Sequence, residues 1–178
     1  MTTRKQDTGG FLRASGRSWE DWISFLDGIG AAELTHTEIA RSIHGTGLAN
    51  GWWSQGIAVA YEQHIGRRKP GQRSTGDFEA SVTKTLVMTR EQAYAAWLRL
   101  VEGGKTFGGV APAGEPTTSL TPKRSYWRIS LADSSRVVVA VEAKGVDKAM
   151  VALQHTKLAS EDRIVHWRKV WKAEFEKL

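Results

Sequence analysis

Five histidines are the side chains of this sequence best suited to acid–base or metal chemistry, and they are scattered along the chain. None of them has the H-x-x-x-H or H-E-x-x-H spacing that places two zinc ligands on one helix face. The sequence contains no cysteine, which excludes disulfides, thiolate metal sites and a cysteine nucleophile. The G-x-S-x-G, Walker A and G-x-G-x-x-G motifs are also absent. We therefore predict a protein that is not an enzyme and needs no metal or cofactor.

Residues 35–65 loosely resemble a helix-turn-helix, in which a second helix reads DNA. Such a helix brings polar side chains to base edges and basic groups to phosphates. Residues 51–65 contain no Lys or Arg, and basic residues come only after them. The candidate nucleic-acid-binding residues are Ser54, Gln55, Arg67, Arg68, Lys69 and Arg73. Nucleic-acid binding is therefore the alternative function, set against simple packing of three helices.

The positive charge of the chain is unevenly distributed. Lys and Arg number 25 and Asp and Glu 19, which gives a net charge of +6. Residues 1–83 hold 9 basic and 9 acidic side chains, whereas residues 84–178 hold 16 and 10, so the whole excess lies in the second half. Phosphate neutralisation supplies most non-specific affinity for nucleic acid. The charge thus lies away from the segment that resembles a DNA-binding motif.

The first part of the chain is predicted to be helical. Residues 1–17 are polar and are expected to form a flexible tail. Three helices are expected within 18–66, each opening on a capping residue (Ser18, Thr35 and Asn50) and separated by Gly-rich turns. Residues 67–77 are basic and contain Gly and Pro, which predicts a linker.

The second part of the chain, 78–178, is predicted to be α+β. A strand at 78–88 and a helix at 90–102 precede a loop at 103–124 that contains five Gly and three Pro. Period-two alternation then predicts three strands in a meander, followed by a long helix at 161–177 with a Trp-bearing apolar stripe. We expect an antiparallel sheet gripped by this C-terminal helix and packed with the N-terminal three-helix domain.

Two groups of motifs are similar to known families. S-V-T-K-T-L-V-M followed by T-R-E-Q-A-Y-A-A-W-L, and the ending that begins H-T-K-L-A-S-E-D, resemble the SRPBCC or START-like (helix-grip) superfamily, in its branch related to activators of a chaperone ATPase. S-W-E-D-W, T-H-T-E-I-A and G-W-W-S-Q-G-I-A-V-A-Y-E, with G-Q-R and D-F-E-A-S, resemble a domain family of unknown function that often precedes such a domain. A full helix-grip domain has six or seven strands, whereas four are expected here, so the resemblance implies a truncated member.

The helix-grip resemblance implies a ligand pocket between the sheet and the last helix. Its walls would be Trp97, Trp127, Ile129, Val139, Val141, Leu153, Trp167 and Trp171. The same aromatic stripe at helical spacing is also what a simple filled core requires. The predicted function is therefore non-enzymatic binding of an apolar small molecule or a protein partner; a protein that only adapts or stabilises another is a further alternative.

Two features bear on location. The polar start has no apolar signal region, and the longest apolar run, V-V-V-A-V, has five residues. A membrane-spanning helix needs about 20 apolar residues. We therefore expect a cytoplasmic protein with no membrane partner; the sequence leaves its oligomeric state open.

Overall fold

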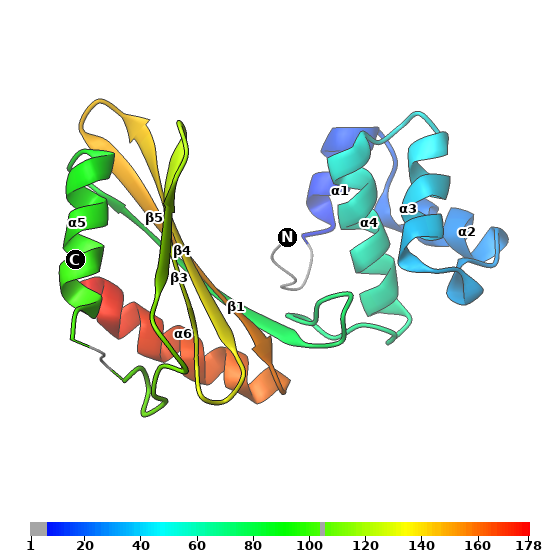
Figure 1. Cartoon of the computed structure of the whole chain (residues 1–178). Helices are drawn as coiled ribbons and strands as arrows, with labels where there is room; N and C mark the ends of the chain where they lie inside the picture. The colour runs from blue at the N-terminus through cyan, green and yellow to red at the C-terminus, as the bar shows by residue number, and fades with distance from the viewer. Residues whose placement is uncertain (1–6, 104–105) are drawn as a thin grey trace. The chain divides into compact units, whose positions relative to one another are not determined.

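The computed structural model describes residues 7–103 and 106–178, which fold as two units that divide between Thr75 and Gly76 (Figure 1). The described residues form six α-helices and one five-stranded sheet, so the predicted α+β class is confirmed. The linker at 67–77 stays a prediction, and the division between the two units falls within it. Arg67 and Arg68 are bonded to the first unit rather than leading away from it.

The first unit contains four α-helices and one 3-10 turn. In chain order these are α1 (Gly9–Ser15), α2 (Trp19–Gly28), η1 (Ala31–Glu33), α3 (His36–Gly45) and α4 (Gly51–His64). The three predicted helices are present as α2, α3 and α4. Side-chain oxygens of Ser18, Thr35 and Asn50 accept backbone hydrogen bonds at their N-termini, as expected for capping residues.

Helix α1 occupies part of the segment that we expected to be a flexible tail, so the three-helix prediction is one helix short. Its Phe11 is buried, with ring centroids 5.7 Å from Trp19 and 6.1 Å from Trp53. A seven-residue helix has little stability of its own. The packing of Phe11 against the two Trp rings therefore stabilises α1. Residues 1–6 of the expected tail lie outside the described residues.

The second unit consists, in chain order, of a strand, a helix, four strands and a helix. The elements are β1 (Phe78–Leu86), α5 (Arg90–Val101), β2 (Thr117–Leu120), β3 (Arg124–Ser130), β4 (Arg136–Gly145), β5 (Lys148–Leu158) and α6 (Glu161–Glu176). Four strands were predicted, and β2 is the one missed. Its T-T-S-L sequence is exposed at every position, so no apolar alternation marks it as a strand.

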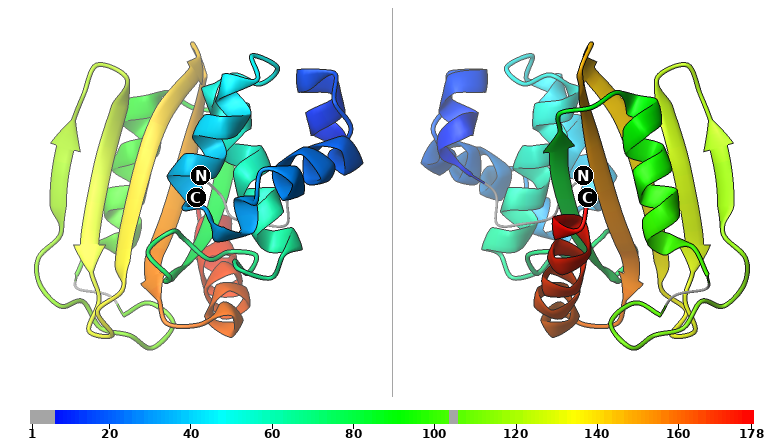
Figure 2. Two further views of the ribbon diagram at one scale, coloured as in Figure 1. Left: turned by 90° about the vertical axis from the view of Figure 1, so that its right-hand side faces the viewer. Right: turned by 90° about the vertical axis from the view of Figure 1, so that its left-hand side faces the viewer.

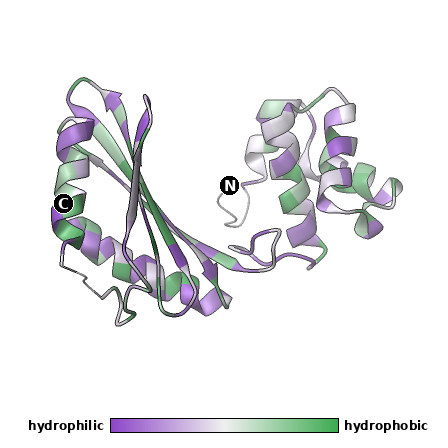
Figure 3. Ribbon diagram, in the orientation of Figure 1, coloured by the Kyte–Doolittle hydropathy of each residue, from purple (hydrophilic) through white to green (hydrophobic). Residues whose placement is uncertain are grey.

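The sheet is antiparallel, in the order β1-β5-β4-β3-β2. Helices α5 and α6 lie on the same face, with α6 against β1 and β5 and α5 against β4 and β5 (Figures 1 and 2). Hydrophobic and hydrophilic residues alternate along the strands and along α6 (Figure 3). The apolar side chains of every second strand residue therefore meet the helices in one core.

Candidate functional site: an apolar cavity at the sheet edge

The eight residues predicted to line a pocket all lie in the core of the second unit. Two of them, Trp127 and Ile129, also line a cavity. The other six are fully buried in the core and are not among the residues lining that cavity: Trp97, Val139, Val141, Leu153, Trp167 and Trp171.

Aromatic rings occupy the space between the sheet and α6. The rings of Trp167 and Trp171 stack with centroids 5.8 Å apart, and Trp97 meets Trp127 and Phe175 edge-on at 5.4 and 5.9 Å. Offset-stacked and edge-to-face pairs are the favourable arrangements for such rings. The place predicted for a ligand is therefore filled by the protein's own side chains.

The edge of the sheet beside β3 contains a bulge at residues 114–116. Just before it, the Ala113 amide donates to the carbonyl of Ser130 at 2.9 Å, and just after it β2 begins to pair with β3. The three bulge residues therefore stand opposite one residue of β3, Ile129. Extra residues bend an edge strand away from its neighbour, and Pro116 has no N–H for the ladder.

An apolar cavity of about 240 Å³ lies at this bulge, and we call it the edge cavity. The C-terminal end of α5, Gly103, Phe107, the segment 112–116 and β3 form its walls. The apolar lining residues are Leu98, Val101, Phe107, Pro112, Pro116, Trp127 and Ile129. The titratable lining residues are Glu102 and Glu115, and two glycines complete the wall.

Residue patterns pointed only indirectly to the edge cavity. Five of its apolar residues were not predicted: Leu98, Val101, Phe107, Pro112 and Pro116. The Gly and Pro content of residues 103–124 marked a long loop, which is often functional, but periodicity could not show that Phe107 folds back into the core. Phe107 is 2% exposed, and its ring lies 5.1 Å from that of Trp171.

A second, polar hollow of about 280 Å³ lies at the same bulge, and we call it the outer hollow. It is lined by outward-facing strand residues, including Arg128 and Arg136. Arg128 is held in place, because its guanidinium donates to Ser119 Oγ at 2.8 Å and lies 4.5 Å from the ring centre of Tyr126. The two hollows share Gly114, Glu115 and Ile129.

A chain of hydrogen bonds joins the exposed Asp133 to the buried Ser135, His155 and Trp171. The indole N–H of Trp171 can only donate, so His155 Nδ1 accepts this bond at 3.0 Å and Nε2 carries the ring proton. His155 Nε2 then donates to Ser135 Oγ at 2.7 Å, and the Ser135 hydroxyl donates to Asp133.

These hydrogen bonds join the three residue types of a catalytic triad, but the direction of proton donation is reversed. A triad histidine accepts the serine proton, whereas here the Ser135 hydroxyl points to Asp133. Burial lowers the pKa of His155 from 6.5 to about 4, so the ring is neutral near pH 7. His155 and Ser135 are 0% and 1% exposed. The chain therefore serves to satisfy buried polar atoms beneath α6.

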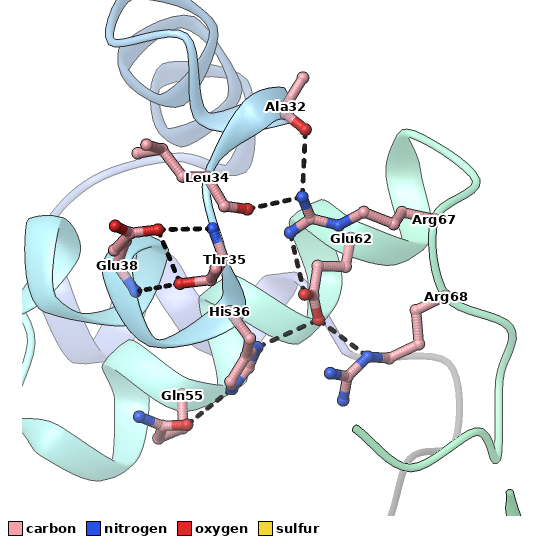
Figure 4. A network of polar contacts seen from close by, with 9 residues as sticks. All are labelled: Ala32, Leu34, Thr35, His36, Glu38, Gln55, Glu62, Arg67 and Arg68. Carbon is pink, nitrogen blue, oxygen red and sulfur yellow. Dashed lines mark hydrogen bonds and ion pairs between the residues drawn. The ribbon is translucent and has the colours of Figure 1, made fainter. Parts of the chain in front are cut away.

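In the first unit, one buried carboxylate contacts a histidine and two arginines (Figure 4). Glu62, at the end of α4, lies 3.1 Å from His36 Nδ1, 3.0 Å from Arg67 Nη2 and 2.8 Å from Arg68 Nε. Burial alone would raise the pKa of Glu62, but the bond from His36 and the charge of Arg68 hold it below the usual value. The same bond to Glu62 raises the pKa of His36, against the opposing effect of burial. The network ties α3 and α4 to the chain that follows them.

The Glu62 network includes three of the six predicted nucleic-acid-binding residues. Gln55 contacts His36 Nε2 at 2.8 Å, and Arg67 also donates to the carbonyls of Ala32 and Leu34. Moving Arg67 or Arg68 onto a phosphate would leave a buried carboxylate with fewer partners, which is costly.

The other three predicted nucleic-acid-binding residues lie in different surroundings. Ser54 is buried, and its hydroxyl donates to backbone carbonyls at the start of α4. Lys69 is exposed and Arg73 is partly buried.

Residues 7–103 and 106–178 contain neither a candidate metal centre nor a membrane-spanning helix. In these ranges no group of three or more His, Asp or Glu side chains could hold a metal ion. None of the helices described there has both the length and the apolar character needed to cross a bilayer.

Comparisons with known proteins found only weakly similar solved structures. No protein-family model and no curated protein matches the chain. The crystal structure of CalU16 from Micromonospora echinospora is similar at 15% identity and a TM-score of 0.40, over 56% of this chain and 71% of that one. The crystal structure of the Mll3558 protein from Rhizobium loti is similar at 16% identity and a TM-score of 0.33, over 57% and 97%. TM-scores this low establish neither a common fold nor a common function.

Proposed function

We propose that the second unit is a non-enzymatic binding module that takes an apolar small molecule into the edge cavity. The observation that carries this proposal is a cavity of about 240 Å³ with seven apolar lining residues, in a domain whose core is otherwise filled by aromatic rings. An apolar cavity of about 150 Å³ is large enough to take up benzene. The edge cavity therefore has room for one substituted aromatic ring or a short branched alkyl chain.

The wall chemistry supports binding without catalysis. Small-molecule sites are concave and mostly apolar, with few polar groups. The titratable residues lining the edge cavity are two exposed glutamates, Glu102 and Glu115. The buried His155 chain is not part of the lining, so its histidine and serine do not face a bound molecule.

The resemblance to a truncated helix-grip domain remains part of this proposal. The order strand, helix, four antiparallel strands, helix supports it, as does the position of α6 across β1 and β5. The resemblance implies a pocket beneath α6, but aromatic rings occupy that place. In our proposal the ligand site has instead moved to the open edge beside β3.

Titration of the ¹⁵N-labelled chain with benzyl alcohol, a neutral single-ring probe, tests the proposal. We expect saturable shifts of the Trp127 indole N–H, with a dissociation constant on the order of a millimolar for so small a ligand. The variant Trp127→Phe assigns that signal among the eight indoles.

A pair of matched variants locates the binding site. Val101→Phe adds volume inside the edge cavity and is expected to abolish binding. Val146→Phe makes the same change in the β4–β5 turn, where Val146 is 88% exposed, and is expected to leave binding unchanged. If benzyl alcohol causes no saturable shift in the unaltered chain, or binds Val101→Phe equally well, the edge cavity is not a binding site.

A further inference from the structure

We infer that the ligand of the edge cavity is an apolar amine, in which a cationic head group accompanies the apolar body. This inference rests on the proposed function and adds the chemical class of the ligand. Three features of the cavity wall carry it: its carboxylates, the helix end that forms one side, and its aromatic rings.

The lining residues of the edge cavity that carry a full charge are both acidic. Glu102 follows the last residue of α5, and Glu115 is the middle residue of the edge bulge. They belong to two different elements that meet at the cavity, and both positions are exposed. An ammonium group at the mouth would therefore interact with two carboxylates while its apolar body is buried.

The end of α5 adds negative potential at the same place. Leu98 and Val101 belong to its last turn, Glu102 follows it directly, and all three line the cavity. The C-terminal end of a helix carries a partial negative charge from its free carbonyl groups, which favours a cation there. Arg99 also lies in this last turn, but it is not a lining residue.

Aromatic rings form the inner wall of the cavity. Trp127 and Phe107 both line it, with ring centroids 6.3 Å apart in an edge-to-face arrangement. Aromatic faces attract cations, most strongly in the case of Trp. They also pack well against an apolar body, so the same wall serves both parts of an amine ligand.

The outer hollow is lined by basic residues and would favour an anionic head group, in contrast to the edge cavity. Arg128 and Arg136 line it, and it shares the bulge with the edge cavity. A ligand with an anionic head would have to place that head in the outer hollow. Within the edge cavity the same anion would meet Glu102 and Glu115. Charge therefore favours a cation in the cavity that has the apolar walls.

Three probes of similar size and different charge test the inference: benzylammonium, benzyl alcohol and benzoate. We expect benzylammonium to bind about fivefold more tightly than benzyl alcohol, since the two partly exposed ion pairs contribute a factor of about two each and the helix end and aromatic wall add the small remainder. We expect benzoate to bind most weakly. The advantage of benzylammonium should shrink when the ionic strength is raised to about 0.5 M, because salt screens exposed charges.

Charge-removing variants assign the effect to the two glutamates. Glu102→Gln and Glu115→Gln should each lower the affinity for benzylammonium about twofold, and the double variant about fourfold, which leaves only the small preference from the helix end and the aromatic wall. Benzyl alcohol binding should be unchanged in all three variants, which shows that they remain folded. Glu91→Gln removes an exposed carboxylate at the other end of α5 and serves as the matched control.

The outcomes separate the two proposals. If benzyl alcohol binds and benzylammonium has no advantage, or if the double variant keeps that advantage, the amine inference is wrong and the binding function stands. If benzoate binds most tightly, the outer hollow with Arg128 and Arg136 holds the head group, and the amine inference is overturned. If none of the three probes binds, the proposed function itself fails.

Discussion

The helix-covered face of the sheet has two regions that contrast in packing. Beneath α6, the rings of Trp167, Trp171 and Phe175 are 0–2% exposed and fill the space against the sheet. Near the end of α5, a three-residue bulge in the sheet edge leaves a cavity of about 240 Å³. Both regions are built from large apolar side chains, and Trp127 belongs to both. The difference teaches that the backbone at the sheet edge, rather than the residue types, decides where a ligand could enter.

The largest expected effect comes from emptying the filled region. Trp167→Ala removes a fully buried indole that stacks on Trp171 and lies 4.2 Å from the ring of His155. We expect the free energy of unfolding of the second unit to fall by about 4 kcal/mol, as for other buried aromatic truncations. Urea unfolding followed by Trp fluorescence measures it. A loss below about 1 kcal/mol would mean that the region beneath α6 is loosely packed, like the edge cavity.

Acid should weaken the filled region through His155. Its pKa falls from 6.5 in the unfolded chain to about 4 in the folded one, so the unfolded state takes up the proton first. The contribution of neutral His155 to the free energy of unfolding is fully present above pH 6.5. It is lost as the pH falls toward 4, and the total loss is about 3 kcal/mol. Hydrogen exchange of α6 amides between pH 7 and 4 reports this locally, without interference from His36 in the first unit.

His155→Gln is the control for the acid effect. Its amide can still accept from Trp171 and donate to Ser135, but it does not titrate. We expect this variant to lose the pH dependence of α6 protection. Equal pH dependence in both chains would show that another group is responsible.

Two adjacent glycines allow the contact between the loop and α6 to be measured. A Cβ at Gly108 would lie 3.1 Å from Val170 Cγ2 and 3.2 Å from Trp167, whereas one at Gly109 would meet no atom within 4 Å. Both have positive φ, +54° and +84°, so alanine is strained at each. We expect Gly109→Ala to cost about 1 kcal/mol and Gly108→Ala about 2 kcal/mol in thermal or urea unfolding. Equal costs would show that this turn is not pressed against α6.

The filled region could be predicted from sequence far better than the cavity. The stripe that includes Trp167 and Trp171 recurs at helical spacing, and alternate Val residues mark β4, so burial follows from periodicity alone. Capping residues such as Thr35 likewise marked helix starts. Local patterns of this kind repeat, and repetition is what a sequence displays.

The edge cavity depends on contacts that do not repeat. The short polar strand β2 is a strand only because β3 pairs with it. The bulge at 114–116 follows from the registers on its two sides, which no local motif specifies. In the first unit, Phe11 turns a polar segment into helix α1 through contacts with Trp19 and Trp53. Tertiary contacts overrode local propensity in each case.

The smallest stability effect is expected at the mouth of the edge cavity. Leu98 lines the cavity and is 36% exposed, so Leu98→Ala should lower the free energy of unfolding by no more than about 0.5 kcal/mol. Benzyl alcohol should nevertheless bind about threefold more weakly, because the probe loses part of the apolar surface that it covers. Denaturation and the ¹⁵N titration, run on the same sample, measure both quantities. Trp167→Ala removes stability, whereas Leu98→Ala should remove affinity and little else. If Leu98→Ala instead destabilises the fold by 2 kcal/mol or more, as expected of a packed core position, the mouth of the cavity is part of the core and the contrast between the two regions disappears.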